Sequence, residues 1–307
     1  MKKKMLSPQR IKLNSKVSLS QIIHGHWRLD QWGLTKQQLG DLINQCLEIG
    51  VTSFDHADIY GNYTCESIFG DALKTNNGIR NNIQIITKCG IKLPSNSFPE
   101  RKIGIYDYSY KHIISSVENS LRNFNTDYID LLLLHRPAPL LNPVEVVEAF
   151  DYLEKSGKVL SFGVSNFTQD EFRMLETYSN QKLVTNQIEI SPYCLEHFEN
   201  HNLDFLLKEQ IRPMAWSPIA GGKIINPDDK KSERINATLK EIADELKVEN
   251  IDTIIYSWLL KHPIGILPIV GSGKISRIKN AIAALNINLT DEQWYKIYTA
   301  STGVGLP

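Results

Sequence analysis

Four side chains that could take part in acid–base chemistry follow separate apolar segments of this chain. Asp55 and Tyr60 come after one such segment, Lys88 after a second, and His135 after a third that consists of leucines. Short apolar and β-branched runs of this kind predict buried strands. Turns at the ends of strands are where α/β proteins place reactive groups. The four residues are therefore candidates for one site, although they are far apart in sequence.

The chemistry open to these groups is proton transfer to an oxygen. A lysine beside a phenol favours the phenolate, so Lys88 is expected to lower the pKa of Tyr60 from its usual value of about 10. Asp55 would hold that lysine, and His135 would donate to or position the same oxygen. We therefore predict that Tyr60 is a general acid. Taken singly, each residue has a plainer interpretation as a helix cap, a packed ring, or a solvated or paired group at a strand end.

The elements that must position these residues alternate along the chain. Short apolar runs that predict strands cover residues 22–23, 52–54, 83–86, 128–134, 159–164, 184–188, 212–216 and 266–270. Segments with helical period lie at 35–47, 66–74, 109–124, 144–156, 169–178, 203–209, 233–246, 252–261 and 274–285. Thr35 and Thr168 are suited to cap helices, Pro143 to begin one, and Gly50 and Gly157 to end one.

This alternation, without a linker rich in Pro, Gly or Ser, predicts an α/β fold of the (β/α)8 TIM-barrel type. The 307 residues are expected to form a single domain, residues 1–307. Residues 11–20 alternate loosely and are expected to form a hairpin that closes the bottom of the barrel. A doubly wound sheet is the rival fold, but the Gly-x-Gly-x-x-Gly that normally follows its first strand is missing.

In a barrel, the carboxyl ends of all strands meet on one face. Besides the four residues above, this face is predicted to carry Trp27, Ser165, Asn166, Gln187, Trp216, Ser217 and residues 271–273. Ser165, Asn166 and Gln187 offer a hydroxyl and two carboxamides, which suit a planar amide ligand. Trp216 could stack flat against such a ligand. The set is the inventory of an active site.

Composition excludes several classes of partner. Lys plus Arg and Asp plus Glu are both 34, which argues against nucleic acid or an anionic membrane. The basic run at residues 1–4 is followed by polar residues rather than an apolar core, so neither a secretion signal nor a membrane span is expected. The cysteines are far apart and form no Cys-x-x-Cys, which favours free thiols in a reducing compartment. We expect a cytoplasmic protein.

Neither a metal centre nor a serine nucleophile is expected. His24, His26 and His56 are expected to be packing or rim residues rather than metal ligands. The segment around Ser165 is not a Gly-x-Ser-x-Gly elbow, so it does not indicate a nucleophilic triad.

These motifs resemble the aldo-keto reductase family over nearly the whole chain. The resemblance is carried by residues 54–61, 66–70, 87–88, 130–137, 157–158, 163–167, 186–187, 216–218 and 271–272, and by Arg277. Within the family, residues 214–217 and 267–274 are most similar to those of bacterial NADP-dependent oxidoreductases.

The resemblance implies a tetrad of Asp55, Tyr60, Lys88 and His135. Tyr60 would be the proton donor while NADPH delivers a hydride to the carbonyl carbon of an aldehyde or ketone. Trp27, Tyr60 and His135 would contact this small-molecule substrate. The residues implied to bind NADP are Ser165, Asn166, Gln187, Trp216, Ser217, Pro218, Ile219, Gly221, Gly222, Gly271, Ser272, Gly273, Lys274, Arg277 and Asn280. Trp216 stands where the family generally has a stacked aromatic, usually tyrosine.

The residues expected near the phosphates of the cofactor agree with this expectation. Residues 217–222 form a glycine-bearing loop, and barrels often bind phosphate after strands seven and eight. Ser272 and Arg277 match the family's contact to the 2′-phosphate of NADP. Gly271 and Ala281 depart from the pattern, since many members have a basic residue and an asparagine there. Lys274 could compensate, so NADP is favoured over NAD; a solvated helix face is the plainer interpretation of Lys274 and Arg277.

Two alternative functions stay open. One is a nucleotide-binding regulatory subunit with little or no turnover, as in the family's potassium-channel β-subunits, although the intact tetrad favours an enzyme. The other is an isomerase or lyase that uses Lys88 for a Schiff base. Neither the carbonyl substrate nor the oligomeric state follows from the sequence. The long segment 90–107 has no assigned role, and its Tyr106, like Tyr108, either reaches the pocket or lies on the surface.

Overall fold

The computed structural model describes residues 8–75 and 78–306, so the basic run at residues 1–4 lies outside them. Parallel strands close into a barrel in which each strand pairs with the next along the chain. These strands are β3 (Ile23–Gly25), β4 (Ser53–Asp55), β5 (Gln84–Cys89), β8 (Ile129–Leu134), β9 (Val159–Ser165), β10 (Asn186–Glu189), β11 (Met214–Trp216) and β12 (Leu267–Val270). Each corresponds to a predicted strand, so the (β/α)8 fold is confirmed.

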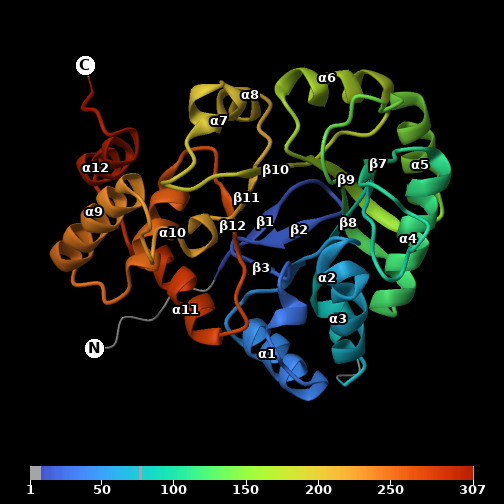
Figure 1. The fold of residues 1–307 in the computed structure, drawn as a ribbon, viewed down its shortest axis with the longest axis horizontal. Helices are drawn as coiled ribbons and strands as arrows, with labels where there is room; N and C mark the ends of the chain where they lie inside the picture. Colours follow the sequence, from blue (N-terminus) through green and yellow to red (C-terminus); the bar gives the residue numbers. More distant parts are fainter. Residues whose placement is uncertain (1–7, 76–77, 307) are drawn as a thin grey trace.

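Helices surround the barrel (Figure 1). The longer ones are α1 (Lys36–Glu48), α3 (Cys65–Leu73), α4 (Tyr110–Phe124), α5 (Pro143–Lys155), α6 (Gln169–Tyr178), α8 (Asn202–Lys208), α9 (Lys230–Leu246), α10 (Ile251–Lys261), α11 (Ile275–Ala283) and α12 (Asp291–Thr302). The short α2 (Tyr60–Tyr63) and α7 (Glu196–Glu199), and the 3-10 turns η1 (Leu29–Gln31), η2 (Ile79–Asn82), η3 (Ala220–Gly222) and η4 (Ala284–Asn286), lie in connections. Among the described residues, no helix has the length and apolar character needed to cross a bilayer.

Local side-chain chemistry sets the helix ends as predicted. Thr35 and Thr168 each form a capping box, with Gln38 and Glu171 respectively. Pro143 is the first residue of α5. Gly50 and Gly157 adopt left-handed backbone conformations (φ 82° and 71°) just after α1 and α5, which glycine does at little cost.

The predicted hairpin is present and closes one end of the barrel. Strands β1 (Arg10–Lys12) and β2 (Ser18–Ser20) pair antiparallel. Ile11 and Leu19 belong to the same apolar cluster as the residues inside the barrel. Figure 1 accordingly shows the hairpin near the middle of the ring of strands. Because the hairpin covers the amino ends of the strands, the carboxyl ends are left for a site.

Alternation along the strands decides which side chains face the interior. Ile86 in β5 and Leu133 in β8 pack inside the barrel, whereas their neighbours Ile85 and Leu134 pack against helices. Side chains two residues apart share a face of a strand. Lys88 therefore faces the same side as Ile86.

The same alternation applies to Asp55. Its neighbour Phe54 packs outward, so Asp55 faces the interior of the barrel. Asp55, Ser165 and Trp216 are the last residues of their strands, and Lys88 is the last but one, so all four lie on strands rather than just after them. Strands β4, β5 and β9 run one to three residues past their predicted ends. Because each strand runs on to its reactive residue, the sheet itself fixes that side chain.

Candidate active site

Lys88 is the centre of the predicted tetrad. Its Nζ donates to both carboxylate oxygens of Asp55 at 2.8 Å, to the carbonyl oxygen of His56 at 2.7 Å and to the hydroxyl of Tyr60 at 3.2 Å. Only 1% of Lys88 and 3% of Asp55 is exposed. The structure thus brings three of the predicted residues into direct contact.

The predicted lowering of the pKa of Tyr60 is wrong for this structure. Burial of the phenol raises its pKa, and this effect exceeds the opposing attraction of Lys88. Burial also disfavours the charge on Lys88, but Asp55 and Tyr60 together outweigh it and raise the pKa of the ammonium. Lys88 is therefore a cation, and Tyr60 carries the proton that a general acid needs.

His135 is the fourth member of the tetrad. Its ring lies edge-on to Tyr60, with centroids 5.9 Å apart. Burial, assisted by Lys88 and Arg136, keeps the pKa of the imidazole well below its ordinary value. Within residues 8–75 and 78–306, neither ring nitrogen is hydrogen-bonded, and Nδ1 is buried. A neutral imidazole can still donate one hydrogen bond, which suits an oxygen placed beside Tyr60.

Sequence reasoning missed the role of His56. Its carbonyl oxygen binds Lys88, while its ring stacks on His26 with centroids 4.4 Å apart, and His24 packs on the other side of His26. All three rings are buried, in agreement with the expectation that they are packing residues. A hydrogen bond to a backbone carbonyl does not depend on the residue type, so no sequence pattern predicts it.

Gln187 has a contact that was not predicted. Its Nε2 donates to Asp55 Oδ1 at 2.7 Å, so it supports the carboxylate of the tetrad. Its Oε1 makes no hydrogen bond within the part of the chain that the structure describes, and stays available as an acceptor. The residue thus joins the tetrad to the predicted amide-binding group.

That amide-binding group is assembled next to the tetrad. Asn166 donates to Ser165 Oγ at 2.9 Å and accepts from the indole N–H of Trp216, also at 2.9 Å. Ser165 Oγ donates to the carbonyl oxygen of Gln187 at 2.8 Å. A hydroxyl, a carboxamide and an indole therefore meet at one place on the rim.

The predicted phosphate-binding segments have an irregular backbone. Residues 217, 220, 221 and 222 all have positive φ, between 51° and 105°. Pro218 is buried in this loop, and Ile219 is half-buried. The N–H groups of Ala220 and Gly222 donate within the loop, to the carbonyl oxygens of Ser217 and Ile219. Loops with left-handed residues are common in anion-binding sites, so the prediction stays open.

On the neighbouring segment, Ser272 Oγ accepts from the backbone N–H of Lys274 at 3.2 Å. Gly271 has open space where a side chain would start, whereas Gly273 lies against Trp32. Lys274 and Arg277 are exposed, and neither forms an ion pair within the described ranges.

Two residues predicted to contact ligands make contacts within the protein, and their predicted roles stay predictions. Asn280 donates to both carboxylate oxygens of Asp252 at 3.0 Å, so its amide ties α11 to α10. Trp27 is 60% exposed and contacts the guanidinium of Arg28, 4.9 Å from its ring centre, rather than the tetrad. The assignment of Trp27 to a substrate pocket stays a prediction.

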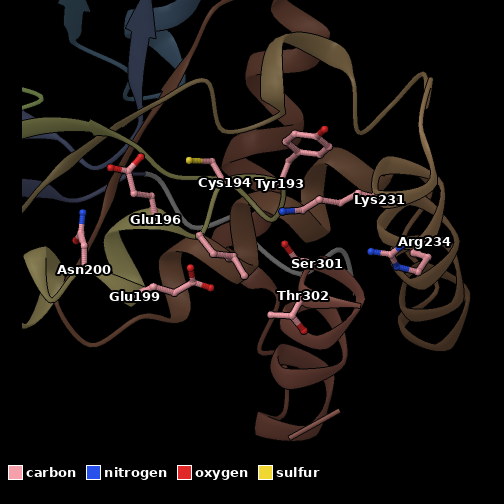
Figure 2. Close-up of a pocket in the computed structure, with 10 residues that line it drawn as sticks. Tyr193, Cys194, Glu196, Glu199, Asn200, Lys231, Arg234, Ser301 and Thr302 are labelled. Carbon is pink, nitrogen blue, oxygen red and sulfur yellow. The ribbon is translucent and has the colours of Figure 1, made fainter. Parts of the chain in front are cut away.

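A separate open cleft of about 740 Å³ lies between α7, α9 and the end of α12 (Figure 2). Its charged side chains are Glu196, Glu199, Lys231 and Arg234, which balance in sign. No predicted site residue lines it. The cluster around Lys88 is the stronger candidate site, because the pKa values of Tyr60, Lys88 and His135 are shifted there.

Comparisons with known proteins agree with this geometry. Residues 21–301 match the sequence model described as the aldo/keto reductase family. The chain is 49% identical to the uncharacterized oxidoreductase YcsN of Bacillus subtilis over 299 residues, covering 97% of this chain and 100% of that protein. It is 39% identical to a 6-dehydroglucose reductase of Agrobacterium fabrum over 298 residues, covering 96% and 98%.

The fold also matches solved structures. The crystal structure of the thermostable aldo-keto reductase Tm1743 superposes with a TM-score of 0.78, covering 96% of this chain and 100% of that one, at 22% sequence identity. At this identity the likeness shows the fold alone.

Asp58 is a buried carboxyl near the tetrad that takes no part in it. Its Oδ2 accepts from Ser116 at 2.7 Å, whereas Oδ1 is buried and has no hydrogen-bond partner among the residues that the structure describes. Burial, with a smaller contribution from Glu66, raises the pKa of this carboxyl to about 8. The folded protein therefore keeps a proton there at neutral pH.

Asp58→Asn should stabilise the protein increasingly as pH rises. Between the ordinary pKa of 3.8 and about 8, only the unfolded chain loses the proton, so the free energy of unfolding of the parent protein falls. Asp58→Asn removes this group, so the free energy of unfolding of the variant does not fall in this way. The difference between the two proteins should grow by at most about 1.4 kcal/mol per pH unit. Urea unfolding of both proteins at pH 5 and pH 8 measures the difference. An equal effect at both pH values would mean that Asp58 is ionised in the folded state.

Proposed function

The chain belongs to the aldo/keto reductase family, and on that premise we propose that it reduces an aldehyde or ketone to the alcohol, with NADPH as hydride donor and Tyr60 as general acid. The observation that carries the proposal is the partly buried contact of 3.2 Å between Tyr60 and Lys88, whose ammonium Asp55 holds. A relative named as a 6-dehydroglucose reductase supports a carbonyl substrate. Free thiols at all four cysteines suit the cytoplasm.

Each residue of the tetrad has its own role in the transfer of one proton to the substrate. NADPH, when bound, supplies the hydride for the carbonyl carbon. Tyr60 gives its phenolic proton to the carbonyl oxygen, and the phenolate that results is stabilised by the cation of Lys88. Neutral His135 donates a second hydrogen bond to the same oxygen and orients it. Solvent then returns a proton to Tyr60.

The donor set of the rim fits a nicotinamide dinucleotide. Ser165, Asn166 and the free Oε1 of Gln187 would hold the carboxamide, and Trp216 would cover one face of the ring. The left-handed loop at 217–222 would face the pyrophosphate. Lys274 and Arg277 at the start of α11, which form no ion pair within the described ranges, would meet the additional phosphate of NADP.

Tyr60→Phe should abolish most of the reduction while leaving cofactor binding intact. Removing the proton donor is expected to lower kcat by roughly 10² to 10⁴. The test follows loss of NADPH absorbance with a panel of aldehydes and ketones, and determines the Kd of NADPH for both proteins. Equal losses of turnover and NADPH affinity would show that Tyr60 is structural. Stoichiometric NADPH binding without turnover in the parent protein would favour the regulatory-subunit alternative.

Arg277→Met should weaken NADPH binding more than NADH binding. The guanidinium is exposed and forms no ion pair with residues 8–75 or 78–306, so the expected loss is confined to its contact with the 2′-phosphate. Lys279→Met removes the same charge from the same helix and serves as the control. The ratio of the Kd values of NADH and NADPH is the measurement. A ratio unchanged by Arg277→Met, or changed equally by Lys279→Met, would reject the NADP assignment.

A further inference from the structure

The segment between β5 and α4 contacts two turns of the candidate site. Its ends form a hairpin, in which β6 (Ile91–Lys92) pairs with β7 (Ile105–Tyr106). The backbone N–H of Asp107 donates to the carbonyl oxygen of Gly90 at 2.9 Å, and its carboxylate pairs with Lys92 at 3.0 Å. The base of the segment is therefore firmly closed.

The turn that carries Tyr60 needs support from outside. Gly61, Asn62 and Tyr63 all have positive φ, at 56°, 53° and 70°. Left-handed residues other than glycine are strained, and they persist only where neighbouring structure holds them. Two such residues, Asn62 and Tyr63, lie two and three positions after the proposed acid, so its position depends on contacts beyond the turn.

The segment supplies those contacts through Tyr63. The hydroxyl of Tyr63 accepts hydrogen bonds from the backbone N–H of Leu93 and from Arg101 Nη1, both at 2.8 Å. Its ring packs edge-on against Phe98 with centroids 4.8 Å apart. Arg101 in turn lies flat on Phe98, 3.6 Å from the ring centre. One side of the segment thus holds the strained turn.

The other end of the segment holds the turn that carries His135. Tyr108, 5% exposed, donates from its hydroxyl to the carbonyl oxygen of Arg136 at 2.6 Å and accepts from the N–H of Arg136 at 3.0 Å. Its ring lies so close to Gly90 that a Cβ there would come within 1.9 Å of it. Tyr108 is therefore a buried residue rather than a surface aromatic, and its hydroxyl is bonded to the backbone of Arg136.

We propose that residues 90–108 form a brace that fixes the turn of Tyr60 relative to the turn of His135, with Tyr63 and Tyr108 as its two positioning residues. The inference rests on the proposed function, in which the phenol and the imidazole meet one substrate oxygen. Small displacements of reacting groups are costly, since an error of about 1 Å can lower a rate about 100-fold. The brace gives this long segment a role.

Tyr63→Phe and Tyr108→Phe each remove one hydroxyl of the brace. Tyr106→Phe is the matched control, because Tyr106 lies in the same hairpin, is 45% exposed and makes no hydroxyl hydrogen bond among the described residues. In single turnovers with saturating NADPH, both brace variants should transfer hydride roughly 10- to 100-fold more slowly, with an unchanged Kd for NADPH. Tyr106→Phe should match the parent protein.

The pH dependence separates positioning from general destabilisation. If the turn relaxes in Tyr63→Phe, the phenol of Tyr60 moves away from Lys88, and the pH at which hydride transfer declines should rise. The double variant should be less impaired than the product of the two single effects, because the brace is already broken by one change. The brace would be overturned if the variants had the pH profile of the parent protein and if the rate effects of the two single changes multiplied fully in the double variant.

Hydrogen exchange tests the brace without relying on turnover. Tyr63→Phe should accelerate amide exchange in residues 57–66, and Tyr108→Phe should do so in residues 134–137, whereas Tyr106→Phe should change neither. If the parent protein reduces no carbonyl compound, the proposed function fails, and exchange alone decides whether the segment holds the two turns. If Tyr63→Phe and Tyr108→Phe exchange in both regions at the same rate as Tyr106→Phe, the inference is overturned, whether or not the protein is a reductase.

Discussion

The candidate site depends on one buried ion pair. Lys88 and Asp55 are almost inaccessible to water, so each charge is tolerated only because the other is 2.8 Å away. The two charges also determine their surroundings: the carbonyl of His56 and the hydroxyl of Tyr60 complete the shell of Lys88, and Gln187 completes that of Asp55. Removing either charge would leave the other unpaired in the barrel, which costs several kcal/mol.

The barrel explains how residues on six strands, or in the connections that follow them, come together around this ion pair. Alternate residues of each strand face inward, and the hairpin β1–β2 closes the opposite end. The polar groups of the candidate site therefore gather at the carboxyl end of the barrel. The predicted amide-binding group follows from the same geometry, because Ser165 and Trp216 end β9 and β11, and Gln187 lies on β10 between these strands. The connections add what strands cannot supply: a strained turn for Tyr60 and loops rich in left-handed residues.

Much of this arrangement was predictable, because local patterns determine it. Apolar runs located all the barrel strands, and threonine caps located the starts of α1 and α6. Helix α12 was missed, although Thr290 caps it in the same way. The direction of the pKa shift of Tyr60 was wrong, because burial depends on the whole fold, whereas a neighbouring lysine can be inferred locally. The contact of Gln187 with Asp55 and the brace at Tyr63 join distant segments, which local patterns cannot reveal.

The most direct test of the account is a fluorescence titration with NADPH and NADH. Trp216 is held by Asn166 beside Gln187, so a nicotinamide ring bound there must lie against the indole. The account predicts saturable quenching of tryptophan fluorescence, tighter with NADPH, and its loss in a folded Trp216→Leu variant. Absence of quenching by either nucleotide, or quenching that survives in the variant, would contradict the assignment of this rim as the cofactor site of a reductase.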